Sequence, residues 1–144
     1  MTLHIIKLCV GVDTVEELAT WQAGRIRDQK KRKVKAPELM HVTRMTPKRK
    51  DEILNGGSLY WVIKGQIAVR QRILDLRAVT KGGTPHCGIV YDPKLVPLQR
   101  RAHRAFQGWR YLEPKDAPPD ARGGKGMANL PEELQRELVE LGLL

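Results

Sequence analysis

The chain has 144 residues, of which 41 % are apolar and 29 % are charged. This length fits one domain with a single core, and the composition excludes a wholly disordered protein. Its 26 Lys and Arg residues outnumber 16 Asp and Glu residues, which leaves a net charge of +10. Such a charge attracts polyanions, nucleic acid first and anionic membranes second, although a basic protein without such a partner is the alternative.

The two cysteines, Cys9 and Cys87, both lie in apolar runs. There is no signal peptide, and no run approaches the roughly 18 apolar residues that suggest a transmembrane helix. We therefore expect buried, reduced thiols, a cytoplasmic location and no membrane partner.

The N-terminal third predicts a strand, a helix and a basic loop. Residues 3–12, LHIIKLCVGV, have the β-branched and aliphatic character of a core strand. Thr14 and Glu17 have the spacing of a capping box, and the apolar periodicity that follows predicts a helix to about Gln29. The run KKRKVK then begins a basic loop at 30–37, either a solvated charge run or an arm that touches phosphates.

Residues 40–45, MHVTRM, predict a short strand, and the Thr-Pro pair after it predicts the start of a helix over 46–57 that ends in Asn-Gly-Gly. Lys48, Arg49 and Lys50 would lie in the first turn of that helix. The helix dipole disfavours cations there, by up to about 1 kcal/mol each. A bound anion would offset this cost, and screening by salt and water is the alternative.

Residues 58–74 predict two strands joined at Gly65. The first strand alternates between two faces, with Leu59, Trp61 and Ile63 on one and Tyr60, Val62 and Lys64 on the other. In the second, Ala68, Arg70, Arg72 and Leu74 face away from Ile67, Val69, Gln71 and Ile73. The two arginines would be roughly 6 to 7 Å apart, close to the spacing of successive phosphates. Arg70 or Gln71 must find a partner inside or beside the core.

Further along, residues 86–92 predict another central strand and residues 95–99 an extended segment. Residues 100–112 contain three of the seven aromatic residues. The predicted domains are then an α+β domain at 1–116, a flexible Pro/Gly linker at 117–129 and a C-terminal helix at 130–144. The apolar stripe of that helix would pack on the domain or on a partner, through Leu134, Leu138 and Leu141.

No catalytic or metal-binding pattern is evident. The four histidines are scattered, without the C-x-x-C or H-x-x-x-H spacing of metal ligands, so we expect no metal and no cofactor. His86 and Cys87 are neighbours on a predicted strand and would point to opposite faces, which prevents them from acting as a pair. No glycine-rich phosphate loop occurs. The catalytic residues, if any, are unknown.

The sequence does offer cations interleaved with aromatic residues. Lys and Arg neutralise phosphates, and aromatic faces stack on unpaired bases for about 1 to 3 kcal/mol each. We therefore predict a surface that binds nucleic acid or another anion, RNA rather than DNA. For Trp61 itself, plain core packing is the favoured role. The predicted residues are Arg44, Lys48, Arg49, Tyr60, Trp61, Lys64, Arg70, Arg72, Trp109 and Arg110.

The motifs HIIKLCVG, HVTRM, GGSLYWVIKG and FQGWRYLEPKDAPP, which span nearly the whole chain, resemble a bacterial domain family of unknown function. The order strand, basic helix ending in I-L-x-G, strand, turn and arginine-bearing strand is also similar to the PUA-like barrels, which include ASCH and EVE domains. Residues 53–56 match that helix end, and Arg70 is the candidate strand arginine.

The PUA-like resemblance implies an α+β fold, either a small mixed β-barrel or a strongly curved sheet, with two to three flanking helices. It also implies binding of RNA or modified bases. The ASCH-like pattern G-x-K-x-x-E-x-R is not kept, because no glutamate follows Gly57 at that spacing. No catalytic role is carried over for this reason.

Three functions remain open from the sequence. The first is a nucleic-acid-binding module for RNA or an unpaired or modified base. The second is a small hydrolase or transferase acting on a nucleoside-like or other anionic substrate, which requires an enclosed pocket with a perturbed Lys64 or a buried acid. The third is an assembly protein that acts through its C-terminal helix; the oligomeric state is unknown. Convergence of Lys64, Arg70 and Trp61 or Trp109 on one concavity would favour the first.

Overall fold

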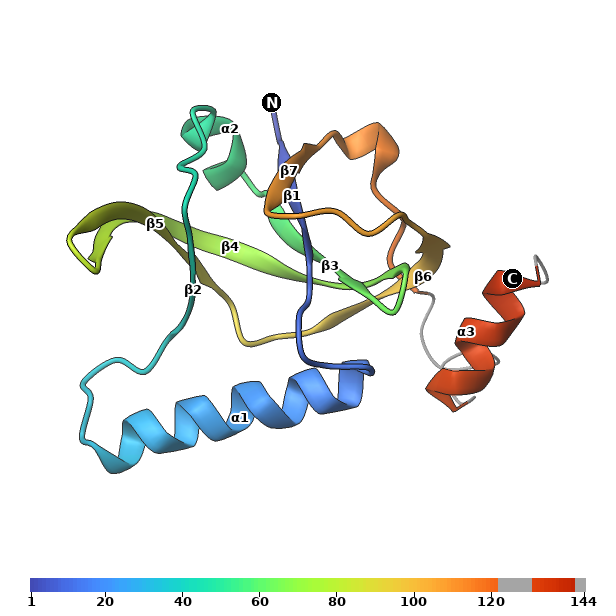
Figure 1. Ribbon diagram of the computed structural model, residues 1–144, viewed down its shortest axis with the longest axis horizontal. Helices are drawn as coiled ribbons and strands as arrows, with labels where there is room; N and C mark the ends of the chain where they lie inside the picture. Colours follow the sequence, from blue (N-terminus) through green and yellow to red (C-terminus); the bar gives the residue numbers. More distant parts are fainter. Residues whose placement is uncertain (122–130, 142–144) are drawn as a thin grey trace.

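The computed structural model describes residues 1–121 and 131–141 and has an α+β fold, in which helices flank one strongly curved sheet (Figure 1). The strands are β1 (His4–Leu8), β2 (Leu39–Thr43), β3 (Ser58–Ile63), β4 (Gln66–Lys81), β5 (Thr84–Tyr91), β6 (Val96–Ala102) and β7 (Trp109–Leu112). The helices are α1 (Val15–Lys31), α2 (Lys50–Leu54) and α3 (Glu132–Glu140), with a single 3₁₀ turn, η1 (Pro114–Asp116). The predicted α+β class is confirmed.

The strand order is β2-β5-β4-β3-β1-β7, and β6 pairs with the first part of β4. Only the β1–β3 pairing is parallel among these ladders. The ladders of β4 shift register opposite Trp61 and Val62 and again between Ile73 and Asp75. Such bulges bend a strand, so β4 can serve both halves of the sheet. The sheet is strongly curved, as one of the two predicted alternatives stated, and it does not close into a barrel.

The sheet buries side chains on both faces. The larger cluster lies between the sheet and α1 and includes Leu18, Leu59 and Trp61; a smaller one on the opposite face includes Tyr60 and Val62. The predicted alternation of β3 is therefore confirmed. The placement predicted for Ile67 was wrong: it belongs to the smaller cluster whereas Val69 belongs to the larger, because the bulge inserts Ala68 between them.

Helix α1 begins where the capping pattern predicted. The Thr14 hydroxyl accepts a hydrogen bond from the Glu17 amide at 3.0 Å. The Glu17 carboxylate reaches back one residue further than in the usual capping box and accepts from the Asp13 amide at 3.2 Å. The helix continues to Lys31, and the basic run 30–35 is exposed throughout.

Helix α2 starts three residues later than predicted, at Lys50 instead of Pro47. The backbone amides of Lys48 and Arg49 both donate to the hydroxyl of Tyr111, at 2.9 and 3.2 Å. This tertiary contact satisfies the two backbone amides that precede the helix, which begins at Lys50. The end predicted at the Asn-Gly-Gly sequence is confirmed. A Cβ on Gly57 would lie 2.2 Å from the Leu3 carbonyl oxygen, so only glycine fits there.

The predicted linker starts too early. Backbone hydrogen bonds of 2.9 Å join Gln99 to Pro119 and Ala121 to Pro97, so residues 119–121 run beside β6. Residues 122–129 of the predicted linker, like residues 130 and 142–144 of the predicted final segment, lie outside the described residues.

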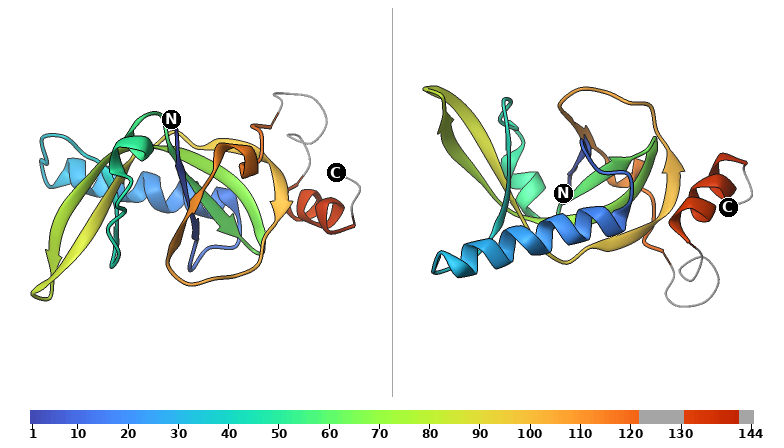
Figure 2. Two further views of the ribbon diagram at one scale, coloured as in Figure 1. Left: turned by 90° about the horizontal axis from the view of Figure 1, so that it is seen from above. Right: turned by 60° about the horizontal axis from the view of Figure 1, so that its bottom comes forward.

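Helix α3 docks on β6 and on the N-terminus of α1 (Figure 2). The Glu132 carboxylate accepts from the amides of Val15 and Glu16, at 2.9 and 3.0 Å, and pairs with the buried Arg100 guanidinium at 3.0 Å. An anion is favourable at a helix N-terminus. The predicted apolar stripe contributes less, since Leu141 is 71 % exposed. No helix within the described ranges is long and apolar enough to cross a bilayer.

Candidate functional site

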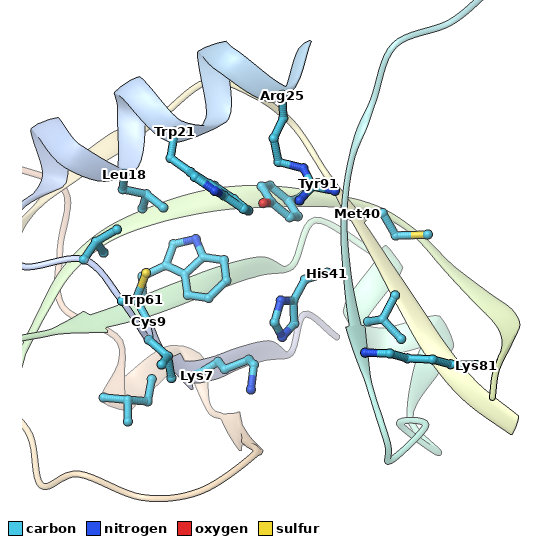
Figure 3. Close-up of a pocket in the computed structure, with 15 residues that line it drawn as sticks. Lys7, Cys9, Leu18, Trp21, Arg25, Met40, His41, Trp61, Lys81 and Tyr91 are labelled. Atoms are coloured by element: carbon cyan, nitrogen blue, oxygen red, sulfur yellow. The ribbon is translucent and has the colours of Figure 1, made fainter. Parts of the chain in front are cut away.

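A pocket of about 540 Å³ lies between α1 and the sheet, with β2 as one wall (Figure 3). Three aromatic side chains and three cations from five secondary-structure elements line it. The aromatic residues are Trp21, Trp61 and Tyr91, and the cations are Lys7, Arg25 and Lys81. Among the described residues, no carboxylate lines this pocket.

The aromatic side chains form a fixed floor and an exposed wall. Trp61 is buried, with edge-to-face contacts to Tyr91 at 6.0 Å and to His41 at 5.8 Å between ring centroids. Its indole N–H donates to the Gln71 side-chain oxygen at 2.9 Å. Trp21 is 49 % exposed, and the Arg25 guanidinium lies 4.9 Å from its ring centroid. Arg25 thus covers one face of the Trp21 ring, and about half of Trp21 remains exposed to a ligand.

The titratable groups of the pocket make it positive and free of anions at neutral pH. Burial lowers the pKa of His41 to about 4, and the charges of Lys7 and Lys81 lower it further, so its imidazole is neutral. Burial raises the pKa of Cys9 to about 11, which keeps it a thiol. Burial also lowers the pKa of Lys7, with a smaller opposing effect of Cys9.

The family model that matches this chain covers residues 5–144 and is described as a protein of unknown function, DUF1489. The chain belongs to the DUF1489 family. The predicted membership of a domain family of unknown function is thereby confirmed. No curated protein and no solved structure matches the chain. The predicted similarity to PUA-like barrels is not confirmed.

In this DUF1489 chain, only Trp61 among the ten predicted site residues lines the pocket. Tyr60 and Arg70 lie on the opposite face of the sheet, in a shallower depression of about 350 Å³. There the Arg70 guanidinium forms two hydrogen bonds of 2.8 Å with Asp120 and one of 3.0 Å with the Ser58 hydroxyl. An intramolecular carboxylate thus already neutralises this arginine. Arg72 on the same strand is exposed.

The other predicted residues form separate groups. Arg44, Lys48 and Arg49 lie before α2, where Arg49 pairs with Glu52 at 2.6 Å. The Trp109 indole N–H donates to the Met45 carbonyl oxygen at 2.8 Å, and the Arg110 guanidinium lies 5.5 Å from the Phe106 ring centroid.

Lys64 is in the turn between β3 and β4, 3.8 Å from Asp13. Lys64 and Trp109 line neither the pocket that contains Trp61 nor the depression that contains Arg70. The predicted convergence on one concavity is therefore absent among the described residues.

Five of the six aromatic and cationic residues that line the pocket were not predicted as site residues from the sequence. One local signal was available: Lys7 interrupts the core strand predicted at 3–12. Trp21 lies within the helix that the capping pattern predicted, but that pattern gives no signal for binding. Arg25, Lys81 and Tyr91 have no local signal, because their shared pocket depends on how α1 and the β4–β5 hairpin approach each other.

The chemistry expected of a hydrolase is not evident. Within the described residues no Asp or Glu is buried, and no group of three potential metal ligands occurs. Lys64 is 47 % exposed and lies outside the pocket. The arrangement suits binding of an anionic, planar ligand better than acid–base hydrolysis.

Proposed function

We propose that this protein binds single-stranded nucleic acid, RNA in the first place, by taking an unpaired base into the pocket between α1 and the sheet. The observation that carries the proposal is the composition of the pocket, in which three aromatic side chains and three cations meet without a carboxylate among the described residues. Stacking surfaces combined with positive charge are typical of proteins that bind single strands.

The aromatic side chains supply the contact to the base. Trp21 is 49 % exposed, and the buried Trp61 is held in position by its hydrogen bond to Gln71, so one side chain can adapt while the other is rigid. Neutral His41 has one donor and one acceptor nitrogen, which suits the polar edge of a base. A volume of about 540 Å³ lies within the usual range of small-ligand pockets.

The cations supply the contact to phosphates. Lys7 and Lys81 lie on the side of the pocket away from α1, and Arg25 lies on α1 itself (Figure 3). The exposed basic run 30–35 begins in the last turn of α1 and extends the positive surface beyond Arg25. The carboxyl end of α1 and the β4–β5 hairpin lie on the same side of the molecule (Figures 1 and 2). A single strand of RNA can therefore run along this side of the molecule, where the positive charge of the protein attracts its phosphates.

A cytoplasmic location is part of the proposal. Both cysteines are free thiols, which fits a reducing compartment.

The test is fluorescence anisotropy of labelled RNA, single-stranded and duplex, with the wild type and with Trp21→Ala. We expect the single strand to bind at least about tenfold more tightly than the duplex, and Trp21→Ala to weaken it about five- to one-hundredfold through lost stacking. Arg72→Ala, on the opposite face, is the control and should change affinity less than about twofold. Equal binding of single strand and duplex, or an unaltered affinity of Trp21→Ala, would refute the proposal.

A further inference from the structure

Lys7 occupies an unusual position for a lysine. It lies on β1, a central strand paired with β3 on one side and β7 on the other, opposite Trp61 and Trp109 in the two ladders. Ile5, two residues before it on the same face, belongs to the larger core cluster. Its side chain therefore points toward the core-facing side of the sheet and into the pocket (Figure 3).

The amine of Lys7 has no neutralising partner among the described residues. No Asp or Glu lies within ion-pair distance of it, and no described carboxylate lines the pocket. Lysine is rarely taken out of water unless it is paired. A half-buried, unpaired lysine in a pocket is therefore a candidate for chemistry as well as for charge.

The surroundings of Lys7 favour its neutral form. The titratable and charged groups that line the same pocket are the Cys9 thiol, the neutral imidazole of His41, the Tyr91 phenol and the cations Arg25 and Lys81, and Trp61 is the cross-strand neighbour of Lys7. Burial disfavours the ammonium ion and lowers the pKa of Lys7. More of this side chain is thus a free amine near neutral pH than is the case for an exposed lysine, and a free amine is a nucleophile for carbonyl carbon.

We infer that Lys7 captures the aldehyde of an anionic ligand in this pocket as an imine. The inference rests on the proposed function and names its ligand class: a nucleotide in a single strand whose sugar presents a free aldehyde because the base has been lost. Arg25 and Lys81 hold the flanking phosphates, and the missing base leaves room for the sugar to reach Lys7.

The reaction is balanced without an oxidant or reductant. The amine lone pair of Lys7 attacks the aldehyde carbon, and a proton passes from nitrogen to oxygen to give a carbinolamine. Water then leaves, and the carbon–nitrogen double bond forms. Addition of water reverses these steps and releases the aldehyde.

The first test uses pyridoxal 5′-phosphate, a planar, anionic aldehyde, as the probe. The whole protein is treated with less than one equivalent, reduced with borohydride, digested and mapped by mass spectrometry. We expect Lys7 to carry at least about fivefold more label than the average exposed lysine. Labelling in proportion to exposure would overturn the inference, and this readout needs no variant.

Variants make the assignment specific. Lys7→Arg keeps the charge but not the nucleophile, and should lose the major labelled peptide. Lys81→Arg, in the same pocket, is the matched control and should keep the label on Lys7 within about twofold. The circular dichroism and melting temperature of Lys7→Arg are compared with those of the wild type to show that the sheet is intact, and Lys7→Met serves as a second variant. Persistence of the same total label in both folded Lys7 variants would contradict the inference.

The second test uses a single-stranded oligonucleotide with one base-free site, trapped with cyanoborohydride, alongside the intact oligonucleotide in an anisotropy titration. A covalent adduct at Lys7 supports the inference. Label from pyridoxal 5′-phosphate at Lys7 without such an adduct, while the intact strand binds, overturns the ligand class. Binding of the intact strand without any preferential reaction of Lys7 overturns the inference and leaves the proposed function standing. Preferential labelling of Lys7 by the small aldehyde without binding of either strand overturns the proposed function and the nucleotide ligand.

Discussion

Gln22 on α1 and Gln71 on β4 exchange two side-chain hydrogen bonds inside the core, at 3.0 and 2.7 Å. Their exposed fractions are 3 % and 0 %. The Gln71 oxygen also accepts from the Trp61 indole, and its amide also donates to the Asp92 carbonyl oxygen at 3.1 Å. This network ties α1 to the sheet directly behind the aromatic floor of the pocket.

Replacing Gln71 should destabilise the fold because it leaves buried polar groups without partners. We expect Gln71→Leu to lower the free energy of unfolding by about 2 to 4 kcal/mol, measured by urea denaturation. Gln99→Leu, an exposed site on β6, is the control and should change it by less than about 0.5 kcal/mol. Adding Gln22→Leu to Gln71→Leu should cost less than the sum of the single changes, since both partners are then apolar. A Gln71→Leu protein as stable as the wild type would contradict this account.

The hydroxyl of Tyr111 should determine where α2 begins. Tyr111→Phe removes the acceptor of the Lys48 and Arg49 amides, and we expect a loss of about 1 to 2 kcal/mol in the free energy of unfolding. Hydrogen exchange should accelerate at these two amides. The Ile53 amide, which bonds to the Arg49 carbonyl oxygen inside α2, is the internal reference. Unchanged exchange at Lys48 and Arg49 would show that another group holds this segment.

The ion pair between Arg70 and Asp120 should make stability depend on acid pH. Hydrogen bonds from Arg70 hold the pKa of Asp120 below its ordinary value of 3.8. Because the folded pKa is depressed, this contribution is complete above about pH 4 and is lost as the pH falls through the folded pKa. We expect at most about 1 kcal/mol, since solvent screens the half-exposed carboxylate.

The measurement for this pair compares urea denaturation of the wild type and Asp120→Asn at pH 7 and pH 3. The difference in stability between the two proteins should shrink at the lower pH. An equal difference at both pH values would exclude the ion pair as the source.

Neutral His41 predicts a second pH dependence, at higher pH. Its folded pKa of about 4 lies below the ordinary value of 6.5, so protons bind the unfolded chain more readily. Its contribution to stability is complete above pH 6.5 and is lost as the pH falls toward 4. We expect the loss to be on the order of 2 kcal/mol, allowing for partial exposure.

For His41, the pH profile of urea denaturation is compared between the wild type and His41→Gln. The variant should lose the share of the dependence between pH 6.5 and 4 that His41 contributes, while His4, whose pKa burial also lowers, keeps its own share. In the wild type, the imidazole carbon-bound proton resonances should stay at neutral positions down to about pH 5 in NMR titrations. Titration of His41 near pH 6.5 would contradict its burial in the neutral form.

The cations of the pocket should set the salt dependence of RNA binding. Each phosphate contact on a single strand contributes about 0.7 to the slope of log K against log salt. Removing two cations with Arg25→Ala and Lys81→Ala together should therefore reduce the slope by about 1.4 and weaken binding. The control removes two cations outside the pocket, Arg72 and Lys115, which should leave the slope nearly unchanged. Equal effects of the two double variants would mean that binding follows net charge alone.

Local patterns were sufficient for several elements. Aliphatic runs bounded by glycine or proline predicted β1 and β5, and Thr14 with Glu17 predicted the start of α1. They succeeded because the deciding forces, burial of alternating side chains and capping of free amides, act within a few residues. The start of α2 was not predictable in this way, since the hydroxyl that satisfies the Lys48 and Arg49 amides comes from Tyr111, 62 residues or more away.

In the candidate site, too, contacts between residues distant in the sequence decided what local patterns could not predict. The prediction that cations and aromatic residues serve one surface grouped Trp61 with Arg70, but Arg70 pairs with Tyr60 and Trp61 with Val69, which puts Trp61 and Arg70 on opposite sides of the sheet. Arg70 then meets Asp120, 50 residues along the chain.

By itself, the sequence determined the positive charge, the α+β class, most strand positions and the alternation of β3, because composition and short-range periodicity carry that information. Only the tertiary structure decided which cations remain unpaired and which aromatic faces stay open. One pocket forms where α1 packs over strands that come from different parts of the chain. It is lined by Lys7, Trp21, Arg25, His41, Lys81 and Tyr91. The physical reason is that ion pairing and exposure are properties of neighbours in space, which residues distant in the sequence supply.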